Sequence, residues 1–203
     1  RCHPKTPDEV KQAIADAGLQ YPVIFRQAGD HGGISTVLLE NANAISAAMY
    51  AFALDGRAYY LTEFRDYASP DGLYRKYRIV VVEGQPYLRH MIVSDNWLIH
   101  SASREYMKQH PQYAEEEAKM LASFNSQLAP QISHVTRALA DKLQLEYFGI
   151  DCNIGADNRL LVFEINANMN ILTNNQPVPN IWQQPIRAII GHLESLIAKR
   201  AKR

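Results

Sequence analysis

The stretch "GIDCNIGADNRLLVFEINANMN", residues 149–170, decides the fold class of this chain. Two apolar segments flank a short polar connection at 155–158, and residue character alternates along both segments. This period-two pattern predicts two antiparallel strands joined by a tight turn. A four-residue connection would pair Asp151 with Val162 and make Glu164 a diagonal neighbour of Asp151, within ~7–8 Å at the backbone. The residues expected to face the core are Ile150, Cys152, Ile154, Leu161, Phe163 and Ile165.

Asp151, Glu164 and Asn166 form a candidate metal site on the other face of this hairpin. Two carboxylates held close together repel one another, so that one of them binds a proton unless a cation intervenes. Two carboxylates and an amide oxygen make an incomplete, all-oxygen shell, which suits Mg²⁺, with Mn²⁺ as an alternative ion. A solvated outer face with ordinary polar residues is the competing interpretation.

A second candidate feature is the loop "FRQAGDHGGIST", residues 25–36, between two expected strands. Glycines allow a loop to bring its backbone N–H groups close to a polyphosphate. Arg26 could hold a phosphate as a fork. The loop residues with this potential are Gly29, His31, Gly32, Gly33 and Ser35. A plain glycine-rich hairpin loop is the alternative, and neither the Walker loop nor the dinucleotide fingerprint is present, because a strand follows.

Composition narrows the classes of partner. The chain has 203 residues, 47% of them hydrophobic, and a formal net charge of zero, which argues against nucleic acid or an acidic membrane as partner. No apolar run approaches the ~20 residues of a membrane helix. Two distant cysteines, Cys2 and Cys152, are typical of a reduced, cytoplasmic protein. Because the chain begins at Arg1, we expect it to be a fragment of a longer polypeptide.

The remaining pattern predicts an α+β protein with mostly antiparallel strands. Thr6 and Glu9 form an expected capping box, Asn43 and Asn180 are expected helix caps, and Glu83 with Gly84 predicts a hairpin turn. Three glutamates at 115–117 are expected in the first turn of a helix. Helices are expected at 6–17, 43–54, within 103–143 and after 180; strands are expected at 21–27, 36–40, 57–64, 74–84 and 86–94.

Together these motifs resemble the ATP-grasp superfamily of glutathione synthetases and D-alanine–D-alanine ligases. The resemblance rests on the glycine loop, the strand with "TEF" at 62–64, the basic hairpin, and the Asp151…Glu164-Ile165-Asn166 pattern. The string "YRKYRIVVVEGQPYLRHMIVSDNWLIH" is also similar to ATP-grasp domains at the end of bacterial tetratricopeptide-repeat proteins. The resemblance implies two small lobes, 1–65 with the flap and 66–203 with the metal site, a nucleotide cleft between them, and a substrate domain upstream.

The resemblance also implies roles for individual residues. Residues 29–35 would cover the phosphates of ATP, and Arg26 would stand where the family usually has a lysine. Gly149 occupies a position where some ligases have an arginine, so Arg89 or Arg104 would replace it. Residues implied against adenine are Thr62, Glu63, Phe64 and Arg65; those implied at the phosphates or the acceptor are Lys76 and Arg78.

The implied activity is that of an ATP- and Mg²⁺-dependent carboxylate–amine ligase that works through an acyl phosphate. Its partners would be small-molecule or peptide carboxylates and amines, together with an upstream domain of the same polypeptide. Three alternatives stay open: an ATP-grasp kinase of a hydroxyl acceptor, a non-catalytic ATP-binding or regulatory module, and an unrelated α+β domain.

Overall fold

The computed structural model describes residues 1–29, 33, 35–50, 52, 56–171 and 177–202. The chain divides into two compact units, Arg1–Asp66 and Tyr67–Arg203. Each unit combines an antiparallel sheet with helices, which confirms the predicted α+β class. None of the helices in these described ranges is both long and apolar enough to cross a membrane.

The first unit is a three-stranded antiparallel sheet of order β2-β1-β3, with two helices. The two helices pack on the face that carries Val23 and Phe25, where a cluster of buried apolar side chains also includes Tyr59. The opposite face carries Ile24 and Arg26. The elements are α1 (Pro7–Asp16), β1 (Val23–Gln27), β2 (Thr36–Leu39), α2 (Ala44–Met49) and β3 (Tyr59–Glu63).

Two helix starts in this unit differ from expectation. Thr6 caps α1 by accepting from the Glu9 N–H (3.3 Å), but the Glu9 carboxylate accepts from the backbone N–H of Lys5 (2.7 Å) rather than that of Thr6. Asn43 makes no capping bond to α2. The Asn41 side chain supplies that cap by accepting from the N–H of Asn43 (2.9 Å), because an Asx turn places its oxygen there. The expected continuation of α2 to residue 54 falls partly on 51 and 53–54, which lie outside the described residues.

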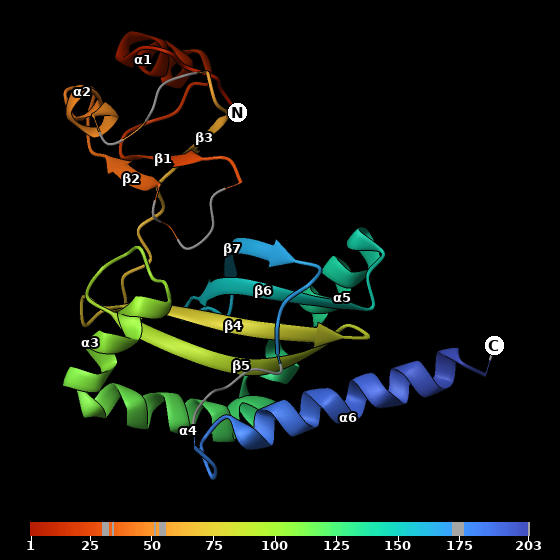
Figure 1. The fold of residues 1–203 in the computed structure, drawn as a ribbon. Helices are drawn as coiled ribbons and strands as arrows, with labels where there is room; N and C mark the ends of the chain where they lie inside the picture. Colours follow the sequence, from red (N-terminus) through yellow and green to blue (C-terminus); the bar gives the residue numbers. More distant parts are fainter. Residues whose placement is uncertain (30–32, 34, 51, 53–55, 172–176, 203) are drawn as a thin grey trace. The chain divides into compact units, whose positions relative to one another are not determined.

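The second unit contains a four-stranded antiparallel sheet of order β5-β4-β6-β7 (Figure 1). Glu83 and Gly84 both have positive φ (48° and 77°), so the predicted hairpin turn between β4 and β5 is confirmed. The elements are β4 (Tyr74–Val82), β5 (Gln85–Ser94), the 3₁₀ turn Ser101–Ser103, α3 (Arg104–Gln109), α4 (Pro111–Gln127), α5 (Ala129–Leu143), β6 (Tyr147–Ile154), β7 (Leu160–Asn166) and α6 (Gln183–Arg200).

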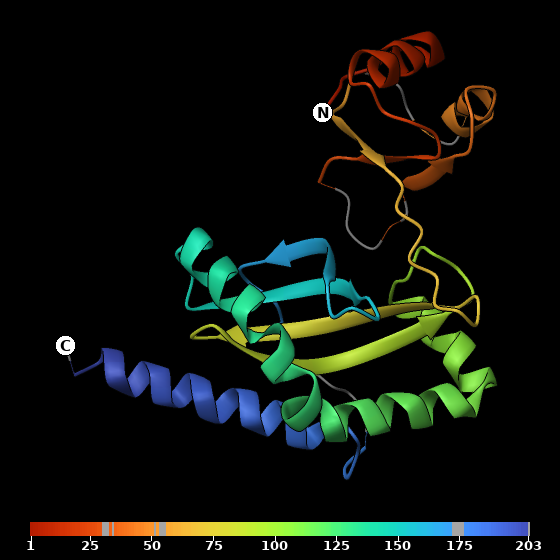
Figure 2. The same cartoon turned by 180° about the vertical axis from the view of Figure 1, so that it is seen from behind.

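The two faces of this sheet have different coverings. Helices α3, α4 and α5 pack on the face that carries Ile79, Phe148 and Ile150, and Figure 2 shows α5 crossing this side. On the other face, α6 packs through Ile189 against Val80 near the hairpin turn. Strand alternation sends Lys76, Arg78 and Asp151 to this second face, whereas Arg75 faces α4.

Two helix starts in the second unit also differ from expectation. Helix α4 begins at Pro111, so the glutamates at 115–117 lie beyond its first turn. Helix α6 has Trp182 at its N-cap position, and the Asn180 side chain, two residues earlier, accepts from the Trp182 N–H (3.1 Å).

Candidate functional site

Asp151 on β6 lies directly opposite Glu164 on β7. The expected pairing of Asp151 with Val162 is therefore wrong. The connection is one residue longer than predicted, since Ile154 pairs with Leu160, and a turn closed by the Gly155 N–H on the Arg159 carbonyl (2.9 Å) spans it.

A β-bulge brings Glu164 to the same face as Asp151. The register shifts between Asp151 and Cys152, which leaves Phe163 as the extra residue on β7. Without the bulge, the five-residue connection would pair Asp151 with Phe163 and turn Glu164 to the opposite face. Phe163, expected in the core, is 39% exposed and its ring lies 4.9 Å from that of Tyr67.

One row of polar residues crosses all four strands of the sheet. His90 pairs with Arg78, Arg78 with Asp151, and Asp151 with Glu164. The β4–β5 ladder shifts beside the same row and leaves Arg89 as its extra residue. Bulges are enriched next to active sites, where they re-aim side chains, and here two of them flank a single row.

The Asp151 side chain is 8% exposed, and two basic side chains hold its carboxylate. Arg78 Nε donates to Oδ1 (2.7 Å), and an Arg78 terminal nitrogen donates to Oδ2 (2.8 Å). Lys76 Nζ lies 3.4 Å from Oδ2. Burial by itself would raise the pKa of Asp151, but the hydrogen bonds and charge of Arg78, with the charge of Lys76, outweigh it and lower that pKa. Asp151 is therefore an anion at neutral pH.

The β5 end of the row is strongly basic. Burial lowers the pKa of His90 well below its usual value, and the charges of Arg104, Arg78, Arg89 and Lys76 lower it further, so His90 is neutral. Burial, followed by the charges of Arg104 and Arg78, lowers the pKa of Arg89. Arg89 is 6% exposed, and its Nε donates to the Ile171 carbonyl (3.2 Å).

The predicted metal ligands share one sheet face, and their donor set fits Mg²⁺. Asn166 pairs with Gly149, two residues from the Asp151–Glu164 pair, so all three oxygen-bearing side chains are on the same side. A carboxylate offers about four lone-pair sites, and Arg78 and Lys76 occupy about three of those of Asp151. Among the described residues, no group of three or more His, Cys, Asp or Glu side chains is placed to hold a metal.

In the first unit, Arg26 and Thr62 lie on the sheet face that α1 and α2 leave uncovered. Arg26 pairs with Thr36 and Tyr60, and Thr62 pairs with Ile24 on the same face. The Thr36 hydroxyl is buried and finds no hydrogen-bond partner among the residues that the structure describes. An unsatisfied buried hydroxyl is unfavourable, so this face contains a polar atom suited to a bound group.

The other residues predicted for nucleotide binding are not all brought together. Glu63 pairs with Val23, so it faces the helices, away from Thr62; its carboxylate forms a 2.8 Å ion pair with the exposed Arg65. The Phe64 N–H donates to the Pro22 carbonyl (3.1 Å). Gly29 and Gly33 have positive φ (80° and 77°), and the Ser35 carbonyl accepts from Gln27 (3.0 Å). His31 and Gly32 lie outside the described residues.

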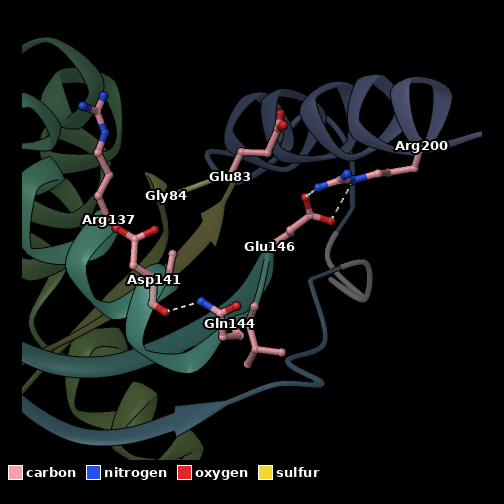
Figure 3. Close-up of a pocket in the computed structure, with 9 residues that line it drawn as sticks. Glu83, Gly84, Arg137, Asp141, Gln144, Glu146 and Arg200 are labelled. Atoms are coloured by element: carbon pink, nitrogen blue, oxygen red, sulfur yellow. Dashed lines mark hydrogen bonds and ion pairs between the residues drawn. The ribbon is translucent and has the colours of Figure 1, made fainter. Parts of the chain in front are cut away.

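An open depression of about 590 Å³ lies at the other end of β4, by the hairpin turn (Figure 3). Its walls include Arg200, which pairs with Glu146, and Gln144, which donates to the Asp141 carbonyl (2.7 Å). None of the predicted site residues lines it. Arg200 pairs with Glu146 there, and Glu83 pairs with Lys199 and His192 of α6. The polar row, which includes predicted site residues, remains the better candidate site.

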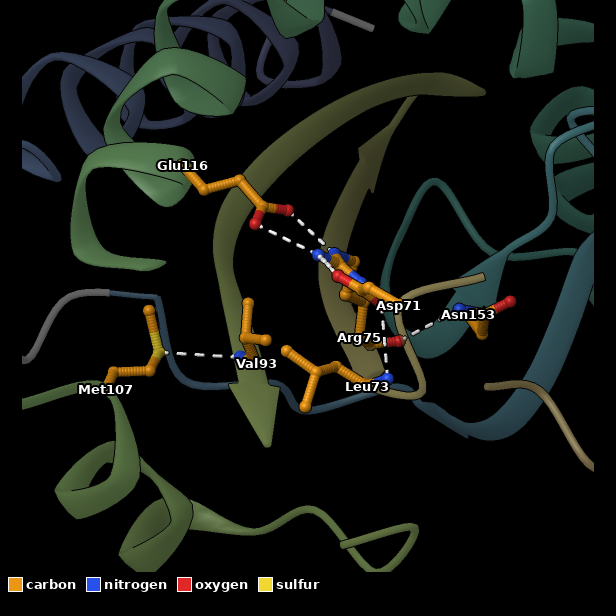
Figure 4. A network of polar contacts seen from close by, with 7 residues as sticks. All are labelled: Asp71, Leu73, Arg75, Val93, Met107, Glu116 and Asn153. Carbon is orange, nitrogen blue, oxygen red and sulfur yellow. Dashed lines mark hydrogen bonds and ion pairs between the residues drawn. The ribbon is translucent and has the colours of Figure 1, made fainter. Parts of the chain in front are cut away.

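The sequence did not indicate that two glutamates of α4 hold basic side chains near the candidate site. Glu116 and Asp71 hold Arg75 at the start of β4, with nitrogen–oxygen distances of 2.7 and 2.8 Å, and the Arg75 carbonyl accepts from Asn153 (Figure 4). Glu117 is 1% exposed and accepts from Arg104. A run of three glutamates gave no signal for this, because only the helical phase decides which of them is buried.

No protein-family model matches the sequence, and no curated sequence matches it significantly. Solved structures, in contrast, are similar to this chain. An ATP-grasp ligase associated with RiPP peptides from Chryseobacterium gregarium, in complex with ADP and a leader and core peptide, is similar with a TM-score of 0.51 and 14% identity; the match covers 97% of this chain and 53% of that one. PurK, an N5-carboxyaminoimidazole ribonucleotide synthetase in complex with ADP, is similar with a TM-score of 0.50 and 15% identity, over 93% and 45%.

These similarities show the ATP-grasp fold for this chain, as its motifs predicted. The chain spans about half the length of the structures that it matches.

Proposed function

We propose that this chain is the nucleotide-binding part of an ATP- and Mg²⁺-dependent carboxylate–amine ligase that works through an acyl phosphate. The observation that carries the proposal is the pairing of Asp151 with Glu164 on one sheet face, beside Arg78 and Lys76, within an ATP-grasp fold. The two similar structures are ligase and synthetase enzymes with bound ADP. The ligase in complex with its peptides supports peptide carboxylates and amines as substrates, and small-molecule carboxylates and amines are the alternative.

Glu164, Asn166 and the remaining lone pair of Asp151 would hold Mg²⁺. When bound, the ion would neutralise charge on the transferring phosphoryl group. Asp151 also fixes the plane of the Arg78 guanidinium through two hydrogen bonds. Arg78 and Lys76 would then direct their remaining N–H donors at phosphate oxygens without having to reorganise.

The first unit would bind the nucleotide. Arg26 would hold a phosphate from the uncovered sheet face, and residues 29–35 would fold over the phosphates. The backbone at 62–65, with Thr62 on the same face as Arg26, would contact adenine. Arg89 would orient the acyl phosphate. In this proposal the units Arg1–Asp66 and Tyr67–Arg203 are the two lobes of the ATP-grasp fold.

The test is release of ADP and phosphate that depends on an added carboxylate and amine. Asp151→Asn is expected to lower the rate by about a hundredfold, as loss of a metal-site carboxylate or its partners does. Asp157→Asn is the matched control, because Asp157 is exposed and pairs with Arg159 outside the row. Hydroxylamine would trap an acyl phosphate as a hydroxamate, and phosphorylation without a hydroxamate would identify a kinase of a hydroxyl group. An Asp151→Asn variant with the parent's rate would end the proposal.

A non-catalytic ATP-binding module is the second candidate. It is favoured by the two-point contact of Arg78 with Asp151, which already neutralises the carboxylate that a metal would use. Calorimetry would distinguish the two, since a module of this kind binds ATP with Mg²⁺ and releases no ADP with any acceptor.

A further inference from the structure

A buried carboxylate lies beside the edge strand β5, outside the row through Asp151. Glu117 is 1% exposed and accepts four hydrogen bonds. Two come from Arg104 (3.0 and 3.1 Å), one from the Trp182 indole N–H (2.8 Å), and one from the Met91 backbone N–H (3.2 Å). A buried carboxylate with this many donors is a fixed anchor, because moving it would leave several polar groups unpaired.

Glu117 and Trp182 together fix the Arg104 side chain. Glu117 takes two of its five N–H groups, and the Trp182 ring lies under the guanidinium with a 5.1 Å separation between Cζ and the ring centroid. The side chain is nevertheless 30% exposed. Within the described part of the chain, no other residue accepts its remaining N–H groups. Arg104 therefore offers fixed and accessible donors, which is the arrangement that binds a carboxylate as a fork.

Arg104 is close to the basic end of the polar row. Its charge lowers the pKa of both Arg89 and His90, as does that of Arg78. Arg89 adds a buried positive charge at this end, and its Nε contacts a neutral carbonyl. Arg78, Arg89 and Arg104 thus bring three guanidinium groups to the β5 end of the row, with the Asp151 carboxylate beside Arg78 and the Glu117 carboxylate beside Arg104. Such a concentration of positive charge attracts an anion.

An anion at Arg104 would be distinct from the group that reacts beside Asp151 and Glu164. Strands in a sheet are about 4.8 Å apart, so β5 is about 10 Å from β6 and about 14 Å from β7. Arg104 belongs to α3, which packs against β5. A single carboxylate cannot contact both ends of a row of this width.

We propose that Arg104, held by Glu117 and Trp182, binds a second carboxylate of an acidic substrate, separate from the carboxylate that is activated. The inference rests on the proposed function and specifies its substrate class. At least one substrate has an additional carboxylate, about 10 Å or more from the carboxylate that is activated beside Asp151 and Glu164. Arg104 is then a specificity-determining residue, and Glu117 and Trp182 are positioning residues.

The test uses the full 203-residue chain without nucleotide. The chain has two tryptophans, so ¹⁵N-labelled protein gives two indole signals, which Trp182→Phe assigns. Glutarate is titrated at constant ionic strength, with glutaramide as its uncharged isostere. The Trp182 signal is expected to shift saturably with glutarate and not with glutaramide, while the Trp97 signal serves as the internal reference. Equal shifts with both compounds would overturn the proposal.

The matched variant is the double substitution Arg104→Gln with Glu117→Gln, which removes both charges and keeps an acceptor for Trp182 and Met91. It is expected to bind glutarate about tenfold more weakly or worse, since a charge-assisted hydrogen bond contributes about that factor. Arg159→Gln, at an exposed ion pair, should bind as the parent does. If the double variant fails to fold, Arg104→Lys keeps the charge and loses the fork. Parent-like binding by either Arg104 variant overturns the proposal.

Failure of this test is distinguishable from failure of the proposed function. Glutarate binding is measured without ATP, whereas the ligase test measures ADP release and its dependence on Asp151. A chain that releases ADP in an Asp151-dependent reaction but does not bind glutarate would retain the ligase assignment and lose the acidic-substrate assignment.

Discussion

Arg78 binds Asp151 at both carboxylate oxygens, from the position directly opposite on the neighbouring strand. Because the Asp151 side chain is 8% exposed, the guanidinium replaces most of the water that it would have in an unfolded chain. The pair sits in the middle of the polar row, between His90 and Glu164. The same contact therefore stabilises the sheet and orients a basic group toward the proposed phosphate site.

Replacing Arg78 with Gln should lower the free energy of unfolding by ~2 kcal/mol at pH 7. Breaking a buried pair costs ~3–5 kcal/mol, and the loss is smaller here because the Arg78 side chain is 31% exposed and Lys76 remains. The pKa of Asp151 is lowered in the folded state, so its contribution exists above the unfolded value of ~3.9 and disappears as pH falls through the folded pKa. Urea unfolding at several pH values checks this. A difference between parent and variant that grows in acid would contradict it.

Gly149→Ala should destabilise the second unit. A Cβ there would lie 1.9 Å from Met169 Sδ and 2.7 Å from Met169 Cβ, so the segment after β7 would have to move. Overpacking of this kind costs ~1–3 kcal/mol. Gly191→Ala in α6 is the control, because its Cβ would meet nothing within 4 Å and a helical alanine should add ~0.5–1 kcal/mol. Met169→Ala removes a buried side chain and is destabilising by itself, but the further loss caused by Gly149→Ala should be smaller in that background than in the parent. Thermal unfolding of the four chains measures this, and absence of any loss at Gly149 would refute the steric account.

The carboxyl group of Asp71 should titrate with a pKa of about 2. The hydrogen bonds from Arg75 are the largest cause, and the Leu73 N–H adds to them. Since this pKa is below the unfolded value of ~3.9, the contact stabilises the fold above that value and is lost as pH falls toward 2. A carboxyl-detected NMR titration measures the pKa directly. Arg75→Gln should return it to the ordinary range; an ordinary value in the parent would show that the contact is absent in solution.

Only one of the two cysteines should react quickly with a thiol reagent in the folded protein. Cys152 is 0% exposed, and burial raises the pKa of its thiol. Cys2 is only half-buried, and this partial burial also raises the pKa of its thiol. Reaction needs an accessible thiolate. We therefore expect one fast thiol in the native chain and two in denaturant. Cys2→Ser should abolish the fast phase, and a fast phase that survives this substitution would place Cys152 at the surface.

Much of the fold followed from local patterns. Alternation along 149–170 predicted the β6–β7 hairpin, and the Glu83–Gly84 pair predicted the turn between β4 and β5. These features depend on residues close in the chain, where turn chemistry and side-chain period are sufficient. The register between Asp151 and Glu164 was not predictable in this way, because the length of the connection and the bulge at Phe163 together decide it.

Local sequence patterns were sufficient for the α+β class, the hairpin that carries Asp151, Glu164 and Asn166, and the motifs of the ATP-grasp fold, whereas the shared face of Asp151 and Glu164 depends on the bulge at Phe163. The contacts of Arg78 with Asp151, and of Arg104 with Glu117 and Trp182, became visible only in the folded chain. These contacts join residues 73, 13 and 78 positions apart in the chain. No local period encodes such pairings: a charged side chain is buried only where the packing of separate elements brings it a partner.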